Sequence, residues 1–427
     1  MNQTGLEGVS VSKLLVTGRK KLSGEVSVQG AKNSVLPILS ASLLARGESV
    51  IYNCPDLSDV EASVNILRYL GCRAERSGQT LVINTDGFDR CDIPDSLMRK
   101  TRSSIVFLGA VLARAGRVRL SFPGGCEIGL RPIDMHLNAL RKLGAEIRER
   151  HGCLDCRAPY GLRGCKISLD FPSVGATEHI MIAACLANGT TCVTNAAREP
   201  EIRDLADFLN SCGAKIYGAG EGEVVIDGVG SLSGCAHSVI PDRIVAATFM
   251  SAAAATGSEI TLTDVIPAHL GAVIPVFEDM GCVIRSSGTT LRIGAPERLK
   301  PLAAVSTMPY PGFPTDAQAP VMAAACVADG TSVFIENIFE NRFRHTRELA
   351  RMGAKIKTEG RVCVVEGRER LYGAKVDSTD LRGAAALVVA SLCAEGKTRI
   401  GSIRYLERGY ENLEVALSSL GADIKRI

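Results

Sequence analysis

The chain has 427 residues, of which 46% are hydrophobic and 22% charged, a composition typical of globular proteins and sufficient for two or three domains. Lys and Arg exceed Asp and Glu only by 49 to 46, which excludes a bulk positive field for holding nucleic acid or an anionic membrane. No apolar run approaches the roughly 18 to 20 residues that cross a bilayer, and the basic cluster at 19–21 lacks the apolar segment of a signal peptide. We therefore predict a cytoplasmic protein with no nucleic-acid partner and no membrane partner.

The cysteines indicate a reducing compartment. There are 15 of them, an odd number, and many lie in apolar surroundings where cysteine acts as a small hydrophobic residue. Cys153 and Cys156 form a Cys-x-x-Cys pair, but no second pair follows at zinc-site spacing. We interpret them as two positions on a short strand and predict no metal site.

One unit of about 70 residues recurs six times along the chain. Its marker is a hydrophobic residue, a glycine and a small residue, and the glycines are Gly71, Gly144, Gly213, Gly281, Gly353 and Gly421. A helical pattern precedes each glycine, such as Val60, Val64 and Leu67 before Gly71, so the glycines are predicted to end helices in the left-handed conformation. Alternating runs follow, such as 214–217 and 223–226, and predict paired strands.

A second landmark runs in register with the first. Ala-rich helices are predicted to end at Gly47, Gly116, Gly189, Gly257, Gly330 and Gly396, each before a strand such as 332–335. The first three units map onto the last three, which predicts an α/β protein of two similar halves with pseudo-threefold symmetry. A cleft between the halves is the default ligand site, although repetition alone also fits a scaffold that only binds partners.

Functional residues should interrupt this repeat. The first interruption is Lys32-Asn33, after a glycine and before an apolar helix. A lysine at a helix start is unfavourable unless an anion uses both its charge and the free N–H groups, and a solvated lysine is the alternative.

The second interruption is the segment 122–132, in which Pro-Gly-Gly precedes Cys126 and Arg131 follows five residues later. A thiol with a pKa near 8.5 is mostly protonated at neutral pH and can donate a proton, whereas a neighbouring arginine favours the thiolate. Loop cysteines are also often incidental.

Two more interruptions lie in the second half. The Pro-flanked turn 310–316 presents Asp316, which suits either a catalytic carboxylate or the N-cap of the next helix. Arg408 lies in a loop before the last helix, where a surface arginine is the alternative. Further arginines near the unit boundaries suit phosphate or carboxylate groups, and they are Arg102, Arg243, Arg342 and Arg382.

Together these segments resemble the UDP-N-acetylglucosamine 1-carboxyvinyltransferase family of the EPSP synthase superfamily, in order and over nearly the whole chain. The segments that carry the resemblance are Lys32-Asn33, Pro123 to Pro132, Ser173 to Thr177, Asn195 to Ile202, Pro241-Asp242-Arg243, Tyr310 to Asp316, Phe339 to Phe343, Thr379 to Arg382 and Arg408 to Glu411. The resemblance implies a two-domain inside-out α/β barrel built from six repeats. It also implies one domain at 32–240, carrying the cysteine loop, and a discontinuous domain at 1–31 plus 241–427.

By the same resemblance, the protein transfers the enolpyruvyl group of phosphoenolpyruvate to the 3-hydroxyl of UDP-N-acetylglucosamine and releases phosphate, the first committed step of peptidoglycan synthesis. The implied catalytic residues are Cys126 as general acid, Asp316 at the sugar hydroxyl, Lys32 and Arg408. Phosphoenolpyruvate would bind Lys32, Asn33, Cys126, Arg131, Arg382 and Arg408. UDP-N-acetylglucosamine would bind Asn33, Arg102, Arg131, Pro132, Ile133, Asp134, Met135, Ser173, Val174, Asp316 and Ile338. The resemblance implies no cofactor and no metal, and covalent inhibition at Cys126 by fosfomycin.

The sequence departs from some family members at Phe171, where those members have a lysine that contacts the nucleotide. Two alternatives remain in view. One is 3-phosphoshikimate 1-carboxyvinyltransferase, whose Asn-Ala-Gly-Thr type motif is not found and to which the Cys126 loop is foreign. The other is an inactive homologue used as a regulator, which would have no need of Lys32, Cys126, Arg131, Asp316 and Arg408 together.

Overall fold

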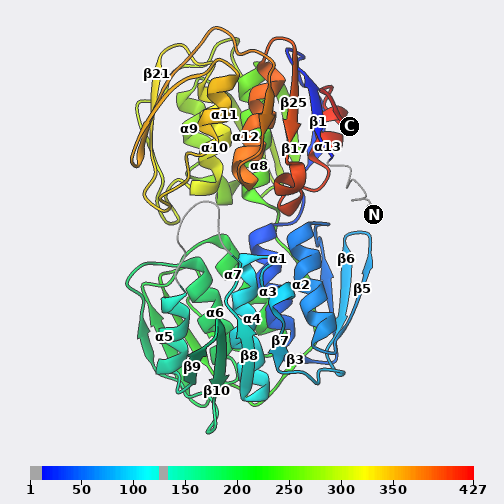
Figure 1. Cartoon of the computed structure of the whole chain (residues 1–427), viewed down its shortest axis with the longest axis vertical. Coiled ribbons are helices and arrows are strands. Elements are labelled where there is room, and N and C mark those ends of the chain that lie inside the picture. Colours follow the sequence, from blue (N-terminus) through cyan, green and yellow to red (C-terminus); the bar gives the residue numbers. More distant parts are fainter. Residues whose placement is uncertain (1–11, 125–132) are drawn as a thin grey trace, which may run out of the picture.

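The computed structural model describes residues 12–124 and 133–427. The chain forms two lobes, one above the other, with the N-terminal strand and the last six α-helices in the upper lobe (Figure 1). Cys126, Arg131 and Pro132 lie outside the described residues.

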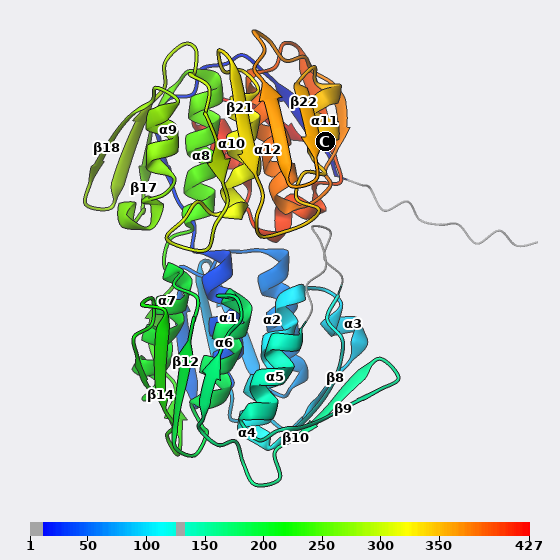
Figure 2. The ribbon, with the colours of Figure 1, turned by 90° about the vertical axis from the view of Figure 1, so that its left-hand side faces the viewer.

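Each lobe has a buried hydrophobic core of its own. One core is drawn from residues 31–239, and the other combines residues 14–28 with 244–424. The predicted domain boundaries, 1–31 with 241–427 and 32–240, stay a prediction, which this separation of the two cores supports. The turned view in Figure 2 shows the same two lobes with sheets on their outer sides.

The lower lobe contains α1 (Lys32–Ser42), α2 (Ser58–Tyr69), α3 (Asp95–Met98), α4 (Val106–Ala115), α5 (Asp134–Lys142), α6 (Val174–Ala184), α7 (Pro200–Ser211) and the 3-10 helix η1 (Arg102–Ile105). The upper lobe contains α8 (Arg243–Thr256), α9 (Ile274–Asp279), α10 (Thr315–Ala325), α11 (Thr346–Arg351), α12 (Leu381–Cys393), α13 (Leu413–Ser419) and the 3-10 helices η2 (Pro267–Leu270) and η3 (Ile403–Arg408).

Within the described ranges, six four-stranded sheets correspond to the six predicted units. In the lower lobe, the first sheet has the strand order β16 (Ala236–Ser238), β4 (Glu48–Tyr52), β6 (Thr80–Asn84), β5 (Arg73–Ser77). The second sheet has the order β7 (Asp92–Ile93), β8 (Arg117–Ser121), β10 (Cys153–Arg157), β9 (Glu146–Arg150). The third sheet has the order β11 (Lys166–Ser168), β12 (Thr190–Thr194), β14 (Glu223–Asp227), β13 (Lys215–Tyr217). A short pair, β15 (Leu232–Ser233) with β3 (Ala45–Arg46), accompanies them.

The upper lobe repeats this order. Its sheets are β18 (Val283–Ser287), β19 (Thr290–Gly294), β17 (Glu259–Thr263), β2 (Glu25–Ser27); then β20 (Val305–Ser306), β21 (Thr331–Ile335), β23 (Val362–Glu366), β22 (Lys355–Glu359); then β24 (Lys375–Asp377), β25 (Lys397–Gly401), β1 (Leu14–Thr17), β26 (Asp423–Arg426). In all six sheets one edge strand is parallel to its neighbour and the remaining pairs are antiparallel.

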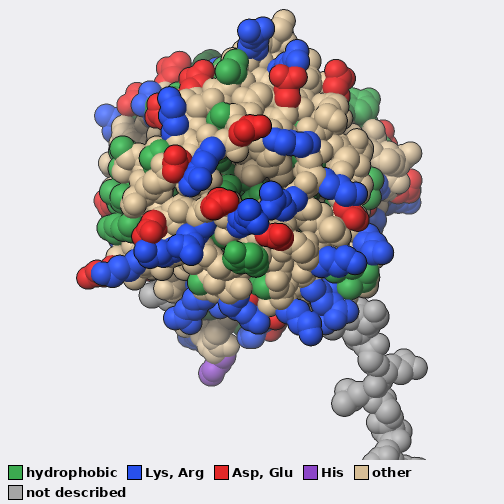
Figure 3. Space-filling view, turned by 90° about the horizontal axis from the view of Figure 1, so that it is seen from above, with side chains coloured by type: hydrophobic (Ala, Val, Ile, Leu, Met, Phe, Trp, Pro, Cys, Tyr) green, Lys and Arg blue, Asp and Glu red, His purple; other side chains and the backbone are tan. Residues whose placement is uncertain are grey.

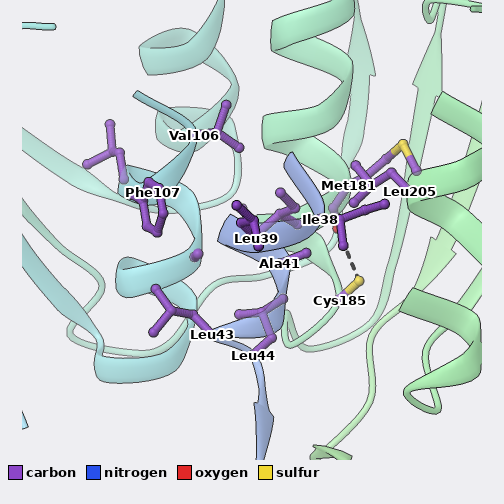
Figure 4. Packing of buried hydrophobic residues seen from close by; sticks show 14 of the residues in the cluster. Ile38, Leu39, Ala41, Leu43, Leu44, Val106, Phe107, Met181, Cys185 and Leu205 are labelled. Atoms are coloured by element: carbon purple, nitrogen blue, oxygen red, sulfur yellow. Dashed lines mark hydrogen bonds between the residues drawn. The ribbon is translucent and has the colours of Figure 1, made fainter. Parts of the chain in front are cut away.

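The Ala-rich helices form the interior. In the upper lobe α8, α10 and α12 pack against one another, and α1, α4 and α6 do so in the lower lobe. Small residues allow three helices to pack closely around one axis, while the sheets cover the outside. Figure 4 shows α1 in the lower core, with Ile38 and Leu39 between Phe107 of α4 and Met181 of α6. The predicted inside-out α/β fold is confirmed.

The two sets of repeat glycines have different roles. Gly71, Gly144, Gly213, Gly281, Gly353 and Gly421 all have φ between 92° and 101°, one residue after a helix C-cap, as predicted. The second set was predicted less well. Gly116 and Gly257 are C-caps, but α1, α6, α10 and α12 end three to five residues before their glycine. There the positive φ serves the turn into the next strand.

The outer surface carries mixed charges. The end of the upper lobe that faces away from the lower lobe shows Lys and Arg side chains interspersed with Asp and Glu (Figure 3). In the part of the chain that the structure describes, no helix is both long enough and apolar enough to cross a membrane.

Candidate active site between the lobes

The chain crosses between the lobes twice, and the two crossings pair with each other. Gly30 forms an antiparallel bridge with Pro241, and the Ala31 N–H donates to the Ile240 carbonyl at 2.7 Å. Immediately after these residues the chain starts α1 in the lower lobe and α8 in the upper lobe. Two inner helices therefore begin side by side at the junction.

Asp242 joins the starts of these two helices. Its Oδ1 accepts hydrogen bonds from the N–H groups of Ile244 (2.8 Å) and Val245 (3.0 Å) and caps α8. Its Oδ2 accepts from the Lys32 N–H of α1 at 3.1 Å. Burial raises the pKa of this carboxyl, although Arg382 and the backbone N–H groups oppose the shift. One carboxylate thus fixes the position of Lys32 relative to the other lobe.

Lys32 and Arg408 meet at a buried carboxylate that the sequence analysis did not select. Lys32 Nζ lies 2.8 Å from Asp59 Oδ2, while Arg408 donates from Nε to Oδ1 at 3.0 Å and from Nη2 to Oδ2 at 3.2 Å. Asp59 belongs to α2 of the lower lobe and Arg408 to η3 of the upper lobe. The cluster Lys32–Asp59–Arg408 therefore spans the junction.

Burial acts on the two lower-lobe members of this cluster in opposite ways. Burial lowers the pKa of Lys32, and the charge of Asp59 restores it only in part. Burial alone would raise the pKa of Asp59, but the charges and hydrogen bonds of Lys32 and Arg408 outweigh it and leave that pKa below its usual value. Asp59 therefore stays ionised and keeps Lys32 closer to its charged form.

Asp316 lies in a second ionic cluster, on the upper-lobe side. Its Oδ1 is 2.6 Å from Arg342 Nη2 and its Oδ2 is 3.0 Å from Arg382 Nη2, and both arginine side chains are almost fully buried. Asp316 is the second residue of α10, whose N-cap is Pro314 with no side-chain capping bond. The N-cap alternative for Asp316 is therefore wrong.

Arg382 links the two clusters. Its positive charge contributes to lowering the pKa of Lys32, and it also acts on Asp242. Its Nη1 donates to the Tyr410 hydroxyl at 3.2 Å, and Tyr410 lies two residues after Arg408. Lys32, Arg382, Asp316 and Arg408 are thus brought into one charged region at the lobe junction.

Two glutamates form a neighbouring inter-lobe contact, and a third lies beside them. Glu201 of α7 accepts from Arg243 of α8 at 3.0 and 3.3 Å, and Glu199 accepts from the Tyr310 N–H at 3.3 Å. Burial, followed by the charges of Glu201 and Glu199, raises the pKa of Glu178 well above its usual value. Arg243 thus offsets the charges of Glu201 and Glu199.

The residues predicted to hold the nucleotide sugar gather mainly around two helix starts. Ile133, Asp134 and Met135 lie at the start of α5, and Ser173 and Val174 at the start of α6, where the Ser173 side chain accepts from the Ala176 N–H. The two helices pack against each other.

Arg102 lies near the start of α5. Burial lowers the pKa of His136 on that helix, and the charge of Arg102 lowers it further. Asn33 is half-buried on α1, next to Lys32. Ile338 lies in the upper lobe, where its N–H donates to Glu336 at 2.7 Å. Phe171, the departure from the family pattern, is 41% exposed just before α6.

The sequence offered little sign of Asp59. It precedes Val60, which the helical pattern places on the buried face of α2, so a charged residue at the edge of that face was the available signal. Its partners lie far along the chain. Among the described residues, no group of three or more His, Cys, Asp or Glu side chains is arranged to hold a metal ion.

Comparison with known proteins gives this geometry a context. Residues 16–417 match the family model described as EPSP synthase (3-phosphoshikimate 1-carboxyvinyltransferase). The chain belongs to this family. It is 49% identical over 417 residues to UDP-N-acetylglucosamine 1-carboxyvinyltransferase 2 of Caldanaerobacter subterraneus, covering 98% of this chain and 100% of the relative. It is 53% identical over 420 residues to UDP-N-acetylglucosamine 1-carboxyvinyltransferase 1 of Symbiobacterium thermophilum, with 97% and 95% covered.

Solved structures agree with the assignment of the enzyme to this family. The enolpyruvyl transferase NikO from Streptomyces tendae superposes with a TM-score of 0.89 at 26% identity, covering 97% of this chain and 99% of the other. EPSP synthase from Acinetobacter baumannii gives 0.73 at 20% identity, with 98% and 100% covered. The latter likeness concerns the fold alone.

Proposed function

We propose that this enzyme transfers the enolpyruvyl group of phosphoenolpyruvate to the 3-hydroxyl of UDP-N-acetylglucosamine and releases phosphate, a step of peptidoglycan synthesis. Near-full-length relatives that are 49–53% identical carry the name of this activity. They support it over 3-phosphoshikimate 1-carboxyvinyltransferase. The observation that carries the proposal in the structure is the convergence of Lys32 and Arg408, from different lobes, on one carboxylate.

This convergence suits the binding of an anion between the lobes. Phosphoenolpyruvate carries a phosphate and a carboxylate, and fixed cations bind such groups more strongly than solvated ones. Asp59 holds Lys32 and Arg408 in place before substrate arrives. Asn33 follows Lys32 on α1, and the charge of Arg382 acts on Lys32. By the family resemblance, Arg131 would complete this set.

The reaction needs an acid at C3 of phosphoenolpyruvate. Protonation of C3 makes C2 electrophilic, and the sugar 3-oxygen then forms a bond to C2. Loss of a proton from C3 and of phosphate from C2 then restores the C2–C3 double bond and gives the enol ether product. We assign the proton donor to Cys126, and the same thiol would be the target of fosfomycin.

Asp316 is assigned to the sugar hydroxyl. Arg342 and Arg382 hold its carboxylate on both oxygens, so its position is fixed independently of substrate. A carboxylate in this state can orient the hydroxyl and accept its proton as the C–O bond forms. The nucleotide part would lie along the starts of α5 and α6 and near Arg102, and Ile338 would contact it from the upper lobe.

Phosphate release tests the proposal directly. Mixing the protein with phosphoenolpyruvate and UDP-N-acetylglucosamine should release phosphate, and omitting either substrate should abolish the release. Replacing the nucleotide sugar with shikimate 3-phosphate should give none, because the proposed acceptor is the sugar nucleotide. If phosphoenolpyruvate released phosphate with shikimate 3-phosphate but not with the nucleotide sugar, the alternative enzyme would be favoured. If it released phosphate with neither acceptor, an inactive regulator would be favoured. We also propose that the enzyme acts in the cytoplasm, a reducing compartment that suits the free cysteines of the described residues.

A further inference from the structure

Two cysteines of the lower lobe lie in sulfur–sulfur contact outside the proposed active site. Cys212 Sγ and Cys235 Sγ are 3.3 Å apart, and both residues are free thiols. Cys212 is the C-cap of α7, and Cys235 lies in the turn that leads from β15 to β16. Across residues 12–124 and 133–427, this is the only hydrogen bond between two cysteine side chains.

The backbone holds the two cysteines in place without help from the sulfur atoms. The Cys212 carbonyl accepts from the Ser233 N–H at 2.9 Å, and the Cys235 carbonyl accepts from the Val50 N–H at 2.8 Å. The sulfur separation of 3.3 Å must shrink by only about 1.2 Å to reach the roughly 2.05 Å of a disulfide. Small rotations of the two side chains can supply this change, because the backbone already brings the chain segments together.

We propose that Cys212 and Cys235 form a reversible disulfide that fastens the end of α7 to the turn before β16. This is a modification site separate from the proposed catalytic cysteine. In a reducing compartment such a bond forms transiently, when an oxidant is present. The oxidant that we name is a hydroperoxide, and the reductant that restores the thiols is a low-molecular-weight thiol.

The two thiols differ in reactivity in the way that this chemistry requires. The hydrogen bond between the two thiols lowers the pKa of Cys235, with a further contribution from the charge of His237. The same hydrogen bond raises the pKa of Cys212. Burial lowers the pKa of His237, but its hydrogen bond and ion pair with Asp204, at 2.9 Å, outweigh this effect and raise it. Cys235 is also the more exposed of the two residues.

The steps balance as follows. The Cys235 thiolate attacks one peroxide oxygen, so an S–O bond forms, the O–O bond breaks, and the leaving hydroxide takes up a proton as water. Cys212 then attacks the sulfenic sulfur of Cys235, so the S–S bond forms, the S–O bond breaks, and a second water leaves with the Cys212 proton. Overall two thiols lose two electrons and two protons, and one hydrogen peroxide becomes two waters.

Hydrogen bonds connect the neighbourhood of the thiol pair to the junction between the lobes. Asp204, the partner of His237, also accepts from the Ile240 N–H at 3.3 Å and from the Ser34 hydroxyl. Ile240 lies at the inter-lobe crossing and Ser34 follows Lys32 on α1 by two residues. The thiol pair is therefore connected to both crossing segments through one histidine and one carboxylate.

The test treats the intact protein with hydrogen peroxide, blocks remaining thiols with iodoacetamide under denaturing conditions, and maps peptides by mass spectrometry. A linked peptide containing Cys212 and Cys235 should form and should disappear on treatment with dithiothreitol. In Cys212→Ser the link should be lost and Cys235 should be trapped by dimedone as its sulfenic acid. In Cys235→Ser the link should also be lost, and Cys212 should remain a thiol. Cys165→Ser, at another partly exposed cysteine of this lobe, should link like the parent.

Oxidation of Cys235 to a sulfinic acid in the parent without any linked peptide would overturn the proposal. So would linkage of Cys235 to other cysteines in comparable amount. The parent measurement needs no substitution, so a folding defect in the serine variants cannot obscure the result. The readout does not depend on activity either, which keeps it separate from the proposed function.

Discussion

The carboxylate of Asp59 is shared by two cations, and its removal should change stability more than its small size suggests. Asp59→Asn leaves Lys32 and Arg408 close together without their common partner. Breaking a buried ion pair by removing one member costs about 3 to 5 kcal/mol in typical cases, with the lower end expected here because Arg408 is one-third exposed. We therefore expect a lower thermal midpoint for the substrate-free variant.

Inorganic phosphate or phosphoenolpyruvate should restore much of this loss, because either anion supplies the missing negative charge. The shift in midpoint on adding phosphate should be larger for Asp59→Asn than for the parent. Asp56→Asn, at an exposed acid just before α2, is the matched control and should change neither midpoint. An equal phosphate shift in parent and variant would mean that Asp59 is only a structural residue of α2.

The chemistry of Cys126 can be separated from its position by two substitutions. A hydroxyl is a far poorer acid than a thiol, so Cys126→Ser should lose most of the turnover. A carboxyl group near bound anions can remain protonated, so Cys126→Asp should keep much of it. Initial rates of phosphate release measure both, and turnover of the serine variant at the parent rate would rule out the acid role. Mass spectrometry should locate fosfomycin on Cys126 and on no other of the 15 cysteines.

Asp316 and Arg408 should affect different kinetic constants. Asp316 is proposed to act on a hydroxyl that is neutral until the C–O bond forms, so Asp316→Ala should lower kcat about a hundredfold or more with little change in KM. Arg408 is proposed to pair with a fully formed anion, so Arg408→Ala should raise KM for phosphoenolpyruvate about tenfold to a hundredfold. Arg408→Lys should recover only part of this loss, because an ammonium cannot reproduce the bidentate geometry.

Equal effects of the two alanine variants on KM for phosphoenolpyruvate, with kcat intact, would contradict this division. In that case Asp316 would serve to position Arg342 and Arg382, with which it forms its ion pairs.

Among the helices, the pair α5 and α6 carries a titration that the sequence did not indicate. His136 Nδ1 and His179 Nδ1 lie 3.1 Å apart, and both rings are buried. Burial, with a smaller contribution from Arg102, lowers the pKa of His136 to about 4. The unfolded chain has a pKa near 6.5 at this residue, so between pH 6.5 and 4 the unfolded state binds the additional proton.

The stability from this group is therefore fully present above pH 6.5 and is lost as the pH falls toward 4. The shift corresponds to about 3 kcal/mol at its limit. His136→Gln cannot titrate, so its urea midpoint should fall less than that of the parent between pH 7 and 4.5. His151→Gln, at an exposed histidine, should follow the parent. Parallel midpoints for parent and His136→Gln across this range would contradict the assignment.

Local sequence patterns predicted the helix ends that depend on the conformation of a single residue. The six C-cap glycines were identified because a left-handed residue after a helix strongly favours glycine, and all six have positive φ. The ends of α1, α6, α10 and α12 were predicted too late. A glycine in a turn before a strand leaves the same sequence pattern as a glycine that caps a helix, so only the structure separates the two cases.

Across the whole molecule, the repeat predicted two similar halves, but the contacts between the halves were beyond its reach. Asp59 and Arg408 are 349 residues apart, and no spacing rule relates them. Individual cations were selected from the sequence: Lys32 because it interrupts the repeat near a helix start, and Arg382 because it lies near a unit boundary. Asp316, the partner of Arg382, was also selected, but Asp59, the partner of Lys32, was not, since an acid on a helix resembles a solvated residue until the tertiary fold buries it.

The junction between the lobes should depend on Arg243 and its glutamate neighbours. Arg243 and Glu201 form a buried bidentate pair between α8 and α7, with Glu199 and Glu178 close by. Arg243→Met would leave an uncompensated acidic group, so we expect a loss of about 3 to 5 kcal/mol in the free energy of unfolding. The control Arg285→Met, at an exposed arginine of β18, should lose little.

The stability lost in Arg243→Met should depend on pH, because the carboxyl groups at the junction titrate. Without Arg243 the three carboxyl groups repel each other when ionised, and protonation relieves the repulsion. Because the pKa of Glu178 is already raised, by burial and then by Glu201, the deficit of Arg243→Met should be smaller at pH 5 than at pH 8. The double variant Arg243→Met with Glu201→Leu should regain part of the stability, since replacing both members of a buried pair costs less than removing one. Urea midpoints at the two pH values measure this, and a deficit independent of pH would show that Arg243 acts through packing rather than through its charge.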